Sequence, residues 1–407
     1  MNESLRLHRS NLHFENHLQN LEPNHTLLRV LDPDHLTQLM VANETIPRDS
    51  HLRSITPLKG GINSEFSGGG VYSLNFEGDS GHDNLPKIVL KTFAPFVDQQ
   101  NALYESLEYQ GFGEFIQILK NYPSNRISQR EIMCYSSLRD QIPLAMPNFH
   151  LGIVNESTEE AWMFIEDISQ DDPFTYRVSQ DGVDETKIAI KSLSNLHSKF
   201  WGKTDNFVDK GLLGKWWDGR ESDFSSLEVA KYAVEHCLRD HSDILTPHRL
   251  SVIHQAMDKF DDLRQGFSVG PQTLIHWDFG GHNLRIRNST PFNTDVVAFD
   301  WELASIGWPQ WDLVQLLLPE FDADDERTID DYLQYYLSCL PTDIQSTLNL
   351  ETFKEHFDLV VIDHFYKLCG PILFDGISTQ KTGRIYREWI HCLEWIEHRS
   401  ARQLESV

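Results

Sequence analysis

Leu274–Leu284 reads LIHWDFGGHNL, and Val296–Glu302 reads VVAFDWE. The first stretch contains the pattern His-x-Asp-x4-Asn, which ends at Asn283. The second stretch is an apolar run followed by Asp300, and this pattern predicts a strand that presents the Asp300 carboxylate at the edge of a loop. The oxygen-bearing side chains of Asp278, Asn283 and Asp300 guide the interpretation of the rest of the chain.

The spacing of these three residues indicates phosphoryl transfer. Transfer from ATP needs a carboxylate near the acceptor hydroxyl and two oxygen ligands that hold Mg²⁺ against the phosphates. We expect Asp278 to be the catalytic base or the group that orients the hydroxyl, and Asn283 and Asp300 to be the metal ligands. The alternative is that Asp278 and Asn283 are ordinary turn residues near Gly280 and Gly281.

Two histidines in the same stretch allow a different interpretation. The side chains of His276, Asp278, His282 and Asp300 are suitable ligands for the transition metal of a hydrolase. The sequence offers no matching helix-borne pair of histidines to complete such a site. For His276 alone, we expect packing beneath the loop and a hydrogen bond to the backbone.

The composition restricts the classes of function. A net charge of −26 over 407 residues argues against a surface that follows a nucleic-acid backbone, since such a surface must be basic. The acidity would suit a cationic small molecule, but it is also a common route to solubility. No apolar run approaches the roughly 20 residues that span a bilayer, and the N-terminus lacks the apolar core of a secretion signal. The five cysteines are scattered without metal-like pairs, so we expect a cytoplasmic protein of undetermined oligomeric state.

The hydrophobic pattern divides the chain into three parts. Residues 1–50 are polar and predict a short helical extension. Within residues 51–167, strand-like segments predict a small antiparallel sheet, interrupted by a helical insertion over residues 95–127. From residue 168 to residue 407 apolar residues recur at helical spacing. We therefore expect an α+β fold with a sheet-containing N-lobe and a larger, mainly helical C-lobe. The predicted strands cover residues 55–58, 71–76, 87–93, 149–154 and 161–165.

The predicted N-lobe contains a candidate phosphate-binding pair. Lys91 ends a strand one hairpin after a glycine-rich turn, where a phosphate-anchoring lysine is expected. Glu131 is its natural partner, but Ser128–Glu131 also matches the capping box of a helix start, and both roles stay open. Gly68 and Gly69 lie in the turn, where backbone amides can approach phosphates. A strand-end lysine and a glycine-rich hairpin also occur without any ligand.

Three further features have simple structural explanations. Asp312 is expected to bond the backbone of the loop around Asp278 or to cap the following helix. Trp216–Asp218 would form an aromatic and acidic wall for a cationic substrate, although aromatic side chains more often pack in a core. The carboxylates of Glu320–Asp331 are expected at a solvated helix start, where the helix dipole favours them.

These motifs together resemble the aminoglycoside phosphotransferase and choline kinase-like family, which has the two-lobed protein-kinase-like fold. The resemblance implies that Asp278 is the catalytic aspartate and that Asn283 and Asp300 bind magnesium. It also implies that Lys91 and Glu131 form the phosphate-anchoring pair. The matching pieces lie between about residue 54 and residue 320, and the clearest are Leu274–Leu284, Phe299–Glu302, Gly307–Leu313, Met163–Ile168 and Leu193–Trp201.

Two details of the resemblance concern single positions. The backbone from Glu166 to Ile168 would hold the adenine of the nucleotide. Family loops usually have glycine where Trp277 stands, and a bulky indole at this position would narrow the acceptor side of the loop.

The sequence thus predicts an ATP- and Mg²⁺-dependent phosphotransferase that transfers the γ-phosphate to a hydroxyl of a small molecule. Acceptors in the family include aminoglycosides, choline-like alcohols, sugars and other metabolites, and no motif here selects among them. The main alternative is a pseudokinase that binds nucleotide as a regulatory module. The intact set of Asp278, Asn283 and Asp300 argues against it, since loss of one of these is its usual mark.

Overall fold

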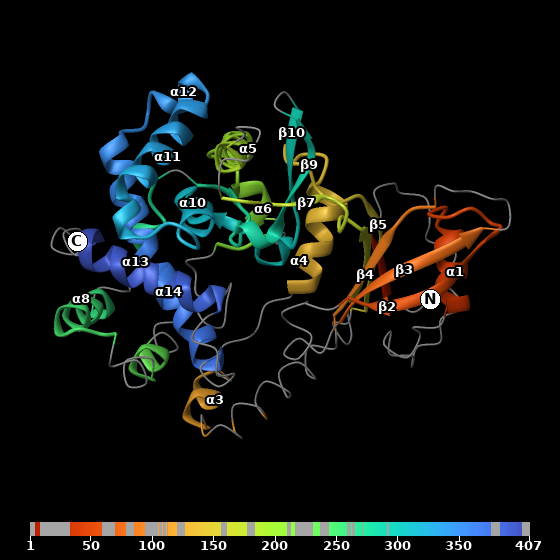
Figure 1. Ribbon diagram of the computed structural model, residues 1–407, viewed down its shortest axis with the longest axis horizontal. Helices are drawn as coiled ribbons and strands as arrows, with labels where there is room; N and C mark the ends of the chain where they lie inside the picture. The colour runs from red at the N-terminus through yellow and green to blue at the C-terminus, as the bar shows by residue number, and fades with distance from the viewer. Residues whose placement is uncertain are drawn as a thin grey trace. The chain divides into compact units, whose positions relative to one another are not determined.

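The chain folds into two compact units. Unit 1 comprises Met1–Tyr109, Arg126–Gln141 and Met146–Asp171, and unit 2 comprises Gln110–Asn125, Ile142–Ala145 and Asp172–Val407. The predicted α+β class is confirmed, since unit 1 contains an antiparallel sheet and unit 2 is mainly helical (Figure 1). The computed structural model describes residues 5–8, 33–58, 70–78, 85–93, 105, 108, 111, 113–119, 127–155, 161–176, 184–209, 213–215, 231–236, 244–258, 262, 265–270, 272–290, 293–375 and 383–400.

Unit 1 is built on a six-stranded antiparallel sheet with the strand order β1-β5-β6-β4-β3-β2. All five strands predicted from the sequence are present. The short strand β1, which pairs with β5, was not predicted, because four residues give too little alternation to recognise. The strands are β1 (Leu5–His8), β2 (Ser50–Pro57), β3 (Gly70–Gly78), β4 (Ile88–Phe93), β5 (Phe149–Asn155) and β6 (Ala161–Glu166).

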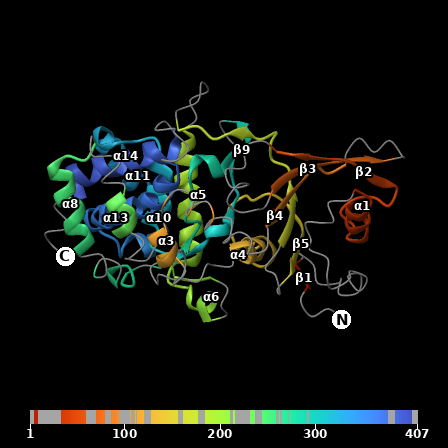
Figure 2. The same cartoon turned by 90° about the horizontal axis from the view of Figure 1, so that it is seen from below.

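Helix α1 (Pro33–Ala42) packs on this sheet and completes the core of unit 1 (Figure 2). Its buried Leu36 and Met40 belong to the same apolar cluster as sheet residues such as Phe164. The hydroxyl of Thr37 accepts a hydrogen bond from the N–H of Leu52 in β2 at 2.8 Å. The part of the N-terminal extension before residue 33, apart from β1, lies outside the described residues.

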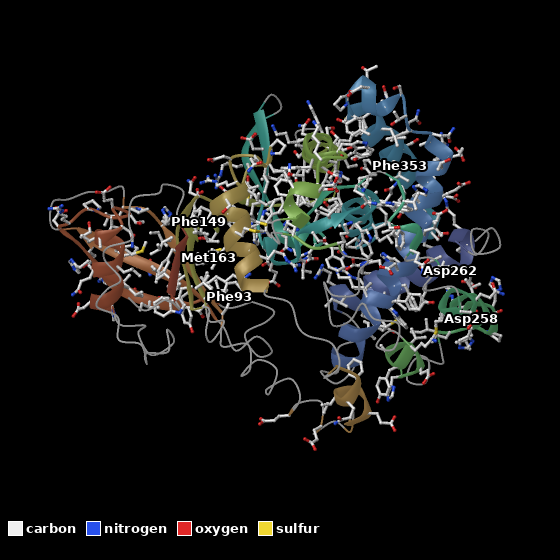
Figure 3. All side chains as sticks on the ribbon, turned by 180° about the vertical axis from the view of Figure 1, so that it is seen from behind. Phe93, Phe149, Met163, Asp258, Asp262 and Phe353 are labelled. Atoms are coloured by element: carbon white, nitrogen blue, oxygen red, sulfur yellow. The ribbon has the colours of Figure 1, made fainter. Side chains whose placement is uncertain are left out.

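Helix α4 (Ile127–Met133), with a π-helical turn at Cys134–Leu138, is also part of unit 1. Figure 3 labels Phe93, Phe149 and Met163 on the strands of this unit. All three side chains are buried, with exposed fractions of 6% or less. Most of the predicted insertion at residues 95–127 lies outside the described residues, but α3 (Gly113–Leu119) is described and belongs to unit 2.

Unit 2 is held together by long helices with buried apolar faces. On α5 (Glu185–Phe200), Ala189, Leu193 and Leu196 form one fully buried apolar face. Helix α13 contacts α10, α11 and α14, and α11 also contacts α5 (Figure 2). Within the described part of the chain, no helix has the length and apolar character needed to cross a membrane. The helices are α3, α5 (Glu185–Phe200), α6 (Asp205–Asp209), α8 (Pro247–Asp258), α10 (Gln310–Leu317), α11 (Glu326–Cys339), α12 (Thr342–Gln345), α13 (Leu350–Asp375) and α14 (Arg384–Trp395).

The acidic stretch Glu320–Asp331 behaves as predicted, because it forms a helix start. Asp322 caps the short 3-10 helix Ala323–Asp325 that leads into α11, and its carboxylate accepts from the N–H of Asp324 at 2.8 Å. Acidic groups at this end of a helix are stabilised by the helix dipole. The stretch therefore needs no ligand to explain it.

Short strands of unit 2 position the loops of interest. Strand β8 (Thr273–Ile275) pairs with β11 (Ser305–Gly307), and β9 (Leu284–Thr290) pairs with β10 (Asn293–Ala298) and β7 (Asp172–Pro173). The chain runs from β8 through the Asp278 loop into β9, and from β10 through Asp300 into β11. The β8–β11 pair and the β9–β10 pair are both antiparallel. The loop that contains Asp278 and the loop that contains Asp300 therefore lie next to each other.

Candidate active site

The strand register of unit 2 brings Asn283 and the Asp300 segment side by side. Leu284 in β9 lies opposite Ala298 in β10, so the residue before β9 and the residue after β10 are neighbours. The N–H of Phe299 donates to the carbonyl of Asn283 at 3.1 Å. Asp300 itself has a left-handed backbone with φ of 66°. Such sparsely populated conformations cost about 1–3 kcal/mol and cluster at functional sites.

Asp278 is fixed by two donors on one of its carboxylate oxygens. Oδ2 accepts from Asn283 Nδ2 at 2.9 Å and from His282 Nε2 at 3.2 Å. The same Asn283 Nδ2 also donates to the carbonyl of Asp278 at 3.0 Å. Within the described residues, Asp278 Oδ1 and Asn283 Oδ1 have no hydrogen-bond partner. Each residue therefore keeps one oxygen that can accept from, or coordinate, a ligand.

The surroundings of Asp278 decide its protonation state. Burial opposes ionisation, but the hydrogen bond from His282 and the nearby cations Lys367 and Arg384 outweigh it. They hold the pKa of Asp278 well below its usual range. The Asp278 side chain is therefore an ionised carboxylate that can accept a hydrogen bond.

Asp312 anchors the backbone that precedes Asp278, as predicted. Its buried carboxylate accepts from the N–H of His276 at 2.9 Å and from the N–H of Trp277 at 2.8 Å. A third donor is His197 Nε2 on α5, at 3.1 Å. This contact explains the Leu193–Trp201 motif, because His197, the histidine of that motif, donates to the Asp312 carboxylate.

Trp277 takes a left-handed backbone, with φ of 61°. This conformation is costly for any residue except glycine, which gives a physical reason for the glycine usual in the family. The indole is only 1% exposed and lies at right angles to the ring of Trp311, 5.7 Å away. The prediction that it narrows the acceptor side is wrong, because the side chain turns into the core of unit 2.

His276 packs beneath the loop and bonds the backbone, as predicted. Its ring is fully buried, and Nε2 donates to the carbonyl of Phe299 at 3.0 Å. Burial lowers the pKa of His276 despite the neighbouring carboxylates. The ring of His282 likewise has both nitrogens engaged, by Asp278 and by Arg384. Three of the four ring nitrogens of His276 and His282 are bonded within the protein, and the fourth, His276 Nδ1, is buried, so these histidines fit a hydrolase metal site poorly.

The sequence pattern did not reveal several residues that support the loop. The ammonium of Lys367 on α13 donates to the carbonyl of Trp277 at 3.1 Å and lies 4.7 Å from the centre of its ring. The hydroxyl of Tyr176 accepts from the N–H of Gly281 at 2.8 Å. Arg384, at the start of α14, donates to His282. No local motif surrounds these three residues, so only their position in the fold identifies them.

In unit 1 the predicted partners Lys91 and Glu131 form an ion pair. Lys91 Nζ lies 2.7 Å from Glu131 Oε2, and the side chains are 19% and 1% exposed. Glu131 therefore pairs with Lys91; the side chain of Ser128, on which the capping-box interpretation depends, lies outside the described residues. Gly68 and Gly69 lie outside them as well.

The segment Glu166–Ile168 ends strand β6 of unit 1. The N–H of Glu166 donates to the carbonyl of Asn148 at 2.8 Å, and that of Asp167 donates to the carbonyl of Lys87 at 2.9 Å. The N–H of Ile168 has no such partner among the residues described.

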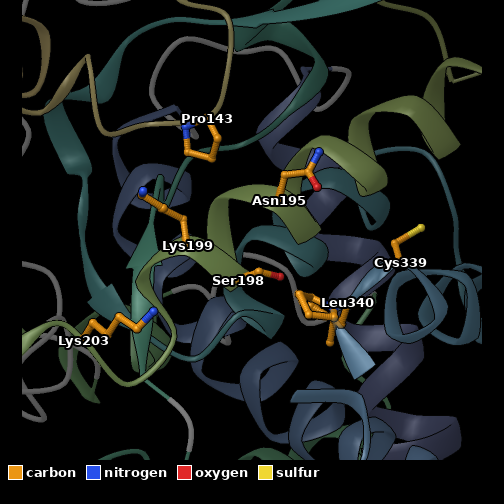
Figure 4. A pocket seen from close by; sticks show the side chains of 8 residues that line it. Pro143, Asn195, Ser198, Lys199, Lys203, Cys339 and Leu340 are labelled. Carbon is orange, nitrogen blue, oxygen red and sulfur yellow. The ribbon is translucent and has the colours of Figure 1, made fainter. Parts of the chain in front are cut away.

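A hollow of about 570 Å³ lies elsewhere in unit 2, at the end of α5 (Figure 4). Its lining is mixed in character and includes Asn195, Ser198, Lys199 and Leu340. Its lining includes none of the residues predicted to bind nucleotide, metal or acceptor. Trp216–Asp218, predicted as a wall for a cationic substrate, lies outside the described residues.

Comparisons with known proteins bear on the family resemblance and the fold. Residues 215–347 match the model of the phosphotransferase enzyme family, and this segment contains Asp278, Asn283 and Asp300. No curated protein sequence matches the chain significantly. The structure of spectinomycin phosphotransferase in complex with ADP and spectinomycin is similar to the chain, with 11% identity and a TM-score of 0.51 over 92% of this chain and 99% of that one.

A second solved structure is the GDP complex of aminoglycoside 2'-phosphotransferase-IIIa. It shares 13% identity, with a TM-score of 0.50 over 89% of this chain and 97% of that one. Likenesses at these identities show the fold. The resemblance found in the sequence is thus confirmed: the chain has the protein-kinase-like fold of solved phosphotransferases, and residues 215–347 match the model of the phosphotransferase enzyme family.

Proposed function

We propose that the protein is a small-molecule kinase that transfers the γ-phosphate of ATP to a hydroxyl, with Mg²⁺. The observation that carries this proposal is the arrangement of Asp278 and Asn283. Asp278 Oδ2 and Asn283 Nδ2 are hydrogen-bonded to each other within the loop. Oδ1 of each residue has no partner among the described residues.

Asp278 is proposed to bind the acceptor hydroxyl. Its Oδ2 is already held by Asn283 and His282, so Oδ1 would accept the hydroxyl hydrogen and fix the direction of the attacking oxygen. Positioning of this kind can supply much of the rate enhancement in phosphoryl transfer, where the protein does little covalent chemistry.

Asn283 and Asp300 fit a magnesium site by the chemistry of their donors. Mg²⁺ prefers carboxylate and amide oxygens, and the amide nitrogen of Asn283 is committed to Asp278, which leaves Oδ1 for the metal. When bound, the ion would neutralise charge on the phosphate oxygens. In unit 1, Lys91 held by Glu131 is proposed to bind the α and β phosphates, Gly68 and Gly69 to approach them, and Glu166–Ile168 to hold the adenine through the Ile168 amide.

The first experiment measures ADP release from ATP and Mg²⁺ with a panel of acceptors. The panel contains aminoglycosides, choline-like alcohols, sugars and other hydroxylated metabolites, and mass spectrometry identifies the phosphorylated product. We expect acceptor-dependent release by the wild type that falls at least a hundredfold in Asp278→Asn, while the affinity for ATP stays within a few fold. Asp331→Asn, an exposed carboxylate on α11, is the matched control and should keep full activity.

Two further variants separate the proposed roles. Lys91→Met should raise the KM for ATP and lower kcat, and Asp300→Asn should increase the concentration of Mg²⁺ needed for half-maximal rate. ATP binding without turnover against any acceptor would favour the pseudokinase. Absence of ATP binding would refute the proposal.

A further inference from the structure

A hydrogen-bonded chain of side chains connects Asp278 to helix α14. His282 Nε2 lies 3.2 Å from Asp278 Oδ2, and His282 Nδ1 lies 2.9 Å from a guanidinium nitrogen of Arg384. The same nitrogen of Arg384 is 3.8 Å from Oε2 of Glu388, one turn further along α14. The imidazole of His282 is therefore the link between the loop and the helix.

The chemistry of the two ends fixes the tautomer of His282. A guanidinium can only donate, so Nδ1 of His282 must accept from Arg384. The hydrogen of the neutral ring is then on Nε2, where it points at the Asp278 carboxylate. Arg384 thus selects the tautomer that can donate to Asp278, and it also fixes the plane of the ring.

Arg384 is itself held by a buried group. Glu388 is fully buried, and its Oε1 accepts from His364 Nε2 at 2.8 Å. His364 Nδ1 lies 3.3 Å from Gln315 Nε2 on α10. The series of side-chain contacts that begins at Asp278 therefore ends in the packed interior of unit 2. There it reaches α10, the helix that also carries Asp312.

The loop leaves space for the His282 ring. A Cβ atom at Gly280 would lie 2.6 Å from the imidazole, so only glycine fits at that position without displacing the ring. His282 is 22% exposed and Arg384 is 29% exposed, so neither residue is needed to fill the core. Packing alone does not explain why two polar side chains meet here.

We infer that His282 is a positioning residue for phosphoryl transfer, and that Arg384 acts through it by fixing its tautomer and orientation. This inference rests on the proposed function. By donating to Oδ2, His282 stops rotation of the Asp278 carboxylate and keeps Oδ1 directed at the acceptor hydroxyl. Misplacement of a reacting group by about 1 Å can lower the rate roughly a hundredfold.

Steady-state kinetics test the inference on the full-length protein, with ATP and the acceptor identified by the panel. We expect His282→Met to lower kcat roughly ten- to a hundredfold, with the KM for ATP within about twofold of the wild type. In His282→Gln, an amide N–H replaces Nε2–H, and kcat should recover to within about fivefold of the wild type. His254→Gln, an exposed histidine on α8, is the matched control.

A double-mutant cycle tests the role of Arg384. Arg384→Met should lower kcat when it is the only substitution, but it should have no further effect when it is added to His282→Met. The effects of substitutions at residues that act through one another are not additive. Arg387→Met, an exposed arginine on the same helix, should leave kcat unchanged. Additive losses, or a raised KM for the acceptor in Arg384→Met alone, would show that Arg384 acts directly on substrate and would overturn the inference.

A measurement without turnover separates failure of this inference from failure of the proposed function. In ¹⁵N spectra of the histidine rings, with His282 assigned by its loss in His282→Gln, we expect the Nε2–H tautomer, and a mixture of tautomers in Arg384→Met. A wild type that shows this tautomer but transfers no phosphate would refute the proposed function while the hydrogen-bonded chain stands. A dominant Nδ1–H tautomer in the wild type would refute the chain itself.

Discussion

Replacement of Asp312 by asparagine tests whether the loop is held by a single buried carboxylate. Asp312 is fully buried and accepts from two backbone N–H groups and from His197, at 2.8 to 3.1 Å. Hydrogen bonds to charged groups contribute about 1.5–3 kcal/mol each. Asparagine keeps one acceptor oxygen, but its NH₂ group would face an N–H donor. We expect Asp312→Asn to lower the free energy of unfolding by about 3–5 kcal/mol, because at least one charged hydrogen bond is lost and a buried donor is left unpaired.

This loss is a large part of the roughly 5–15 kcal/mol that stabilises a typical domain. Urea denaturation, followed by tryptophan fluorescence, measures it, with Asp331→Asn as the exposed control. The backbone N–H groups of His276 and Trp277 precede Asp278 directly, so kcat should also fall at least tenfold in the protein that remains folded. A free energy of unfolding within about 1 kcal/mol of the wild type, together with an unchanged kcat, would refute the anchoring role of Asp312.

Three other substitutions have defined outcomes. Trp277→Gly relieves about 1–2 kcal/mol of left-handed strain but removes a buried indole worth about 3–5 kcal/mol, so urea denaturation should show a net loss of about 1–4 kcal/mol; a more stable variant would contradict this account. Lys367→Met removes the donor to the Trp277 carbonyl and a cation near Asp278, and it should lower kcat about tenfold. The free energy of unfolding should change little, because a buried ammonium and its desolvation cost disappear together. An unchanged kcat would exclude a role for this lysine. Burial raises the pKa of Asp358 from 3.8 to about 6, against the opposing effects of Arg399 and Trp395. The folded state therefore binds this proton more tightly than the unfolded state, and the resulting stabilisation, about 3 kcal/mol, is complete below about pH 4 and is lost as the pH rises to about 6. Asp358→Asn lacks this loss, so its free energy of unfolding relative to the wild type should rise by that amount between about pH 4 and pH 7, and parallel pH profiles would contradict the raised pKa.

The sequence by itself determined five of the six strands described in the sheet of unit 1 and the identity of the loop residues. Alternation of apolar residues depends only on near neighbours in the chain, so β2 to β6 were predictable from their own residues. The spacing of Asp278 and Asn283, and the apolar run before Asp300, are also local. Their roles as catalytic and metal-binding residues remain predictions that the kinetic experiments address.

The tertiary structure alone decided what holds those residues in place. The partners are distant in sequence: His197 and Asp312 are 115 residues apart, Arg384 and His282 are 102 apart, and Lys367 and Trp277 are 90 apart. A local pattern cannot record such pairs, because a histidine or lysine on a helix has the same sequence signature whether it faces solvent or a buried carboxylate. The left-handed backbone of Trp277 was hidden for the same reason: contacts from Asp312 and Lys367, and burial of the indole, offset a strain that the residue type would otherwise avoid.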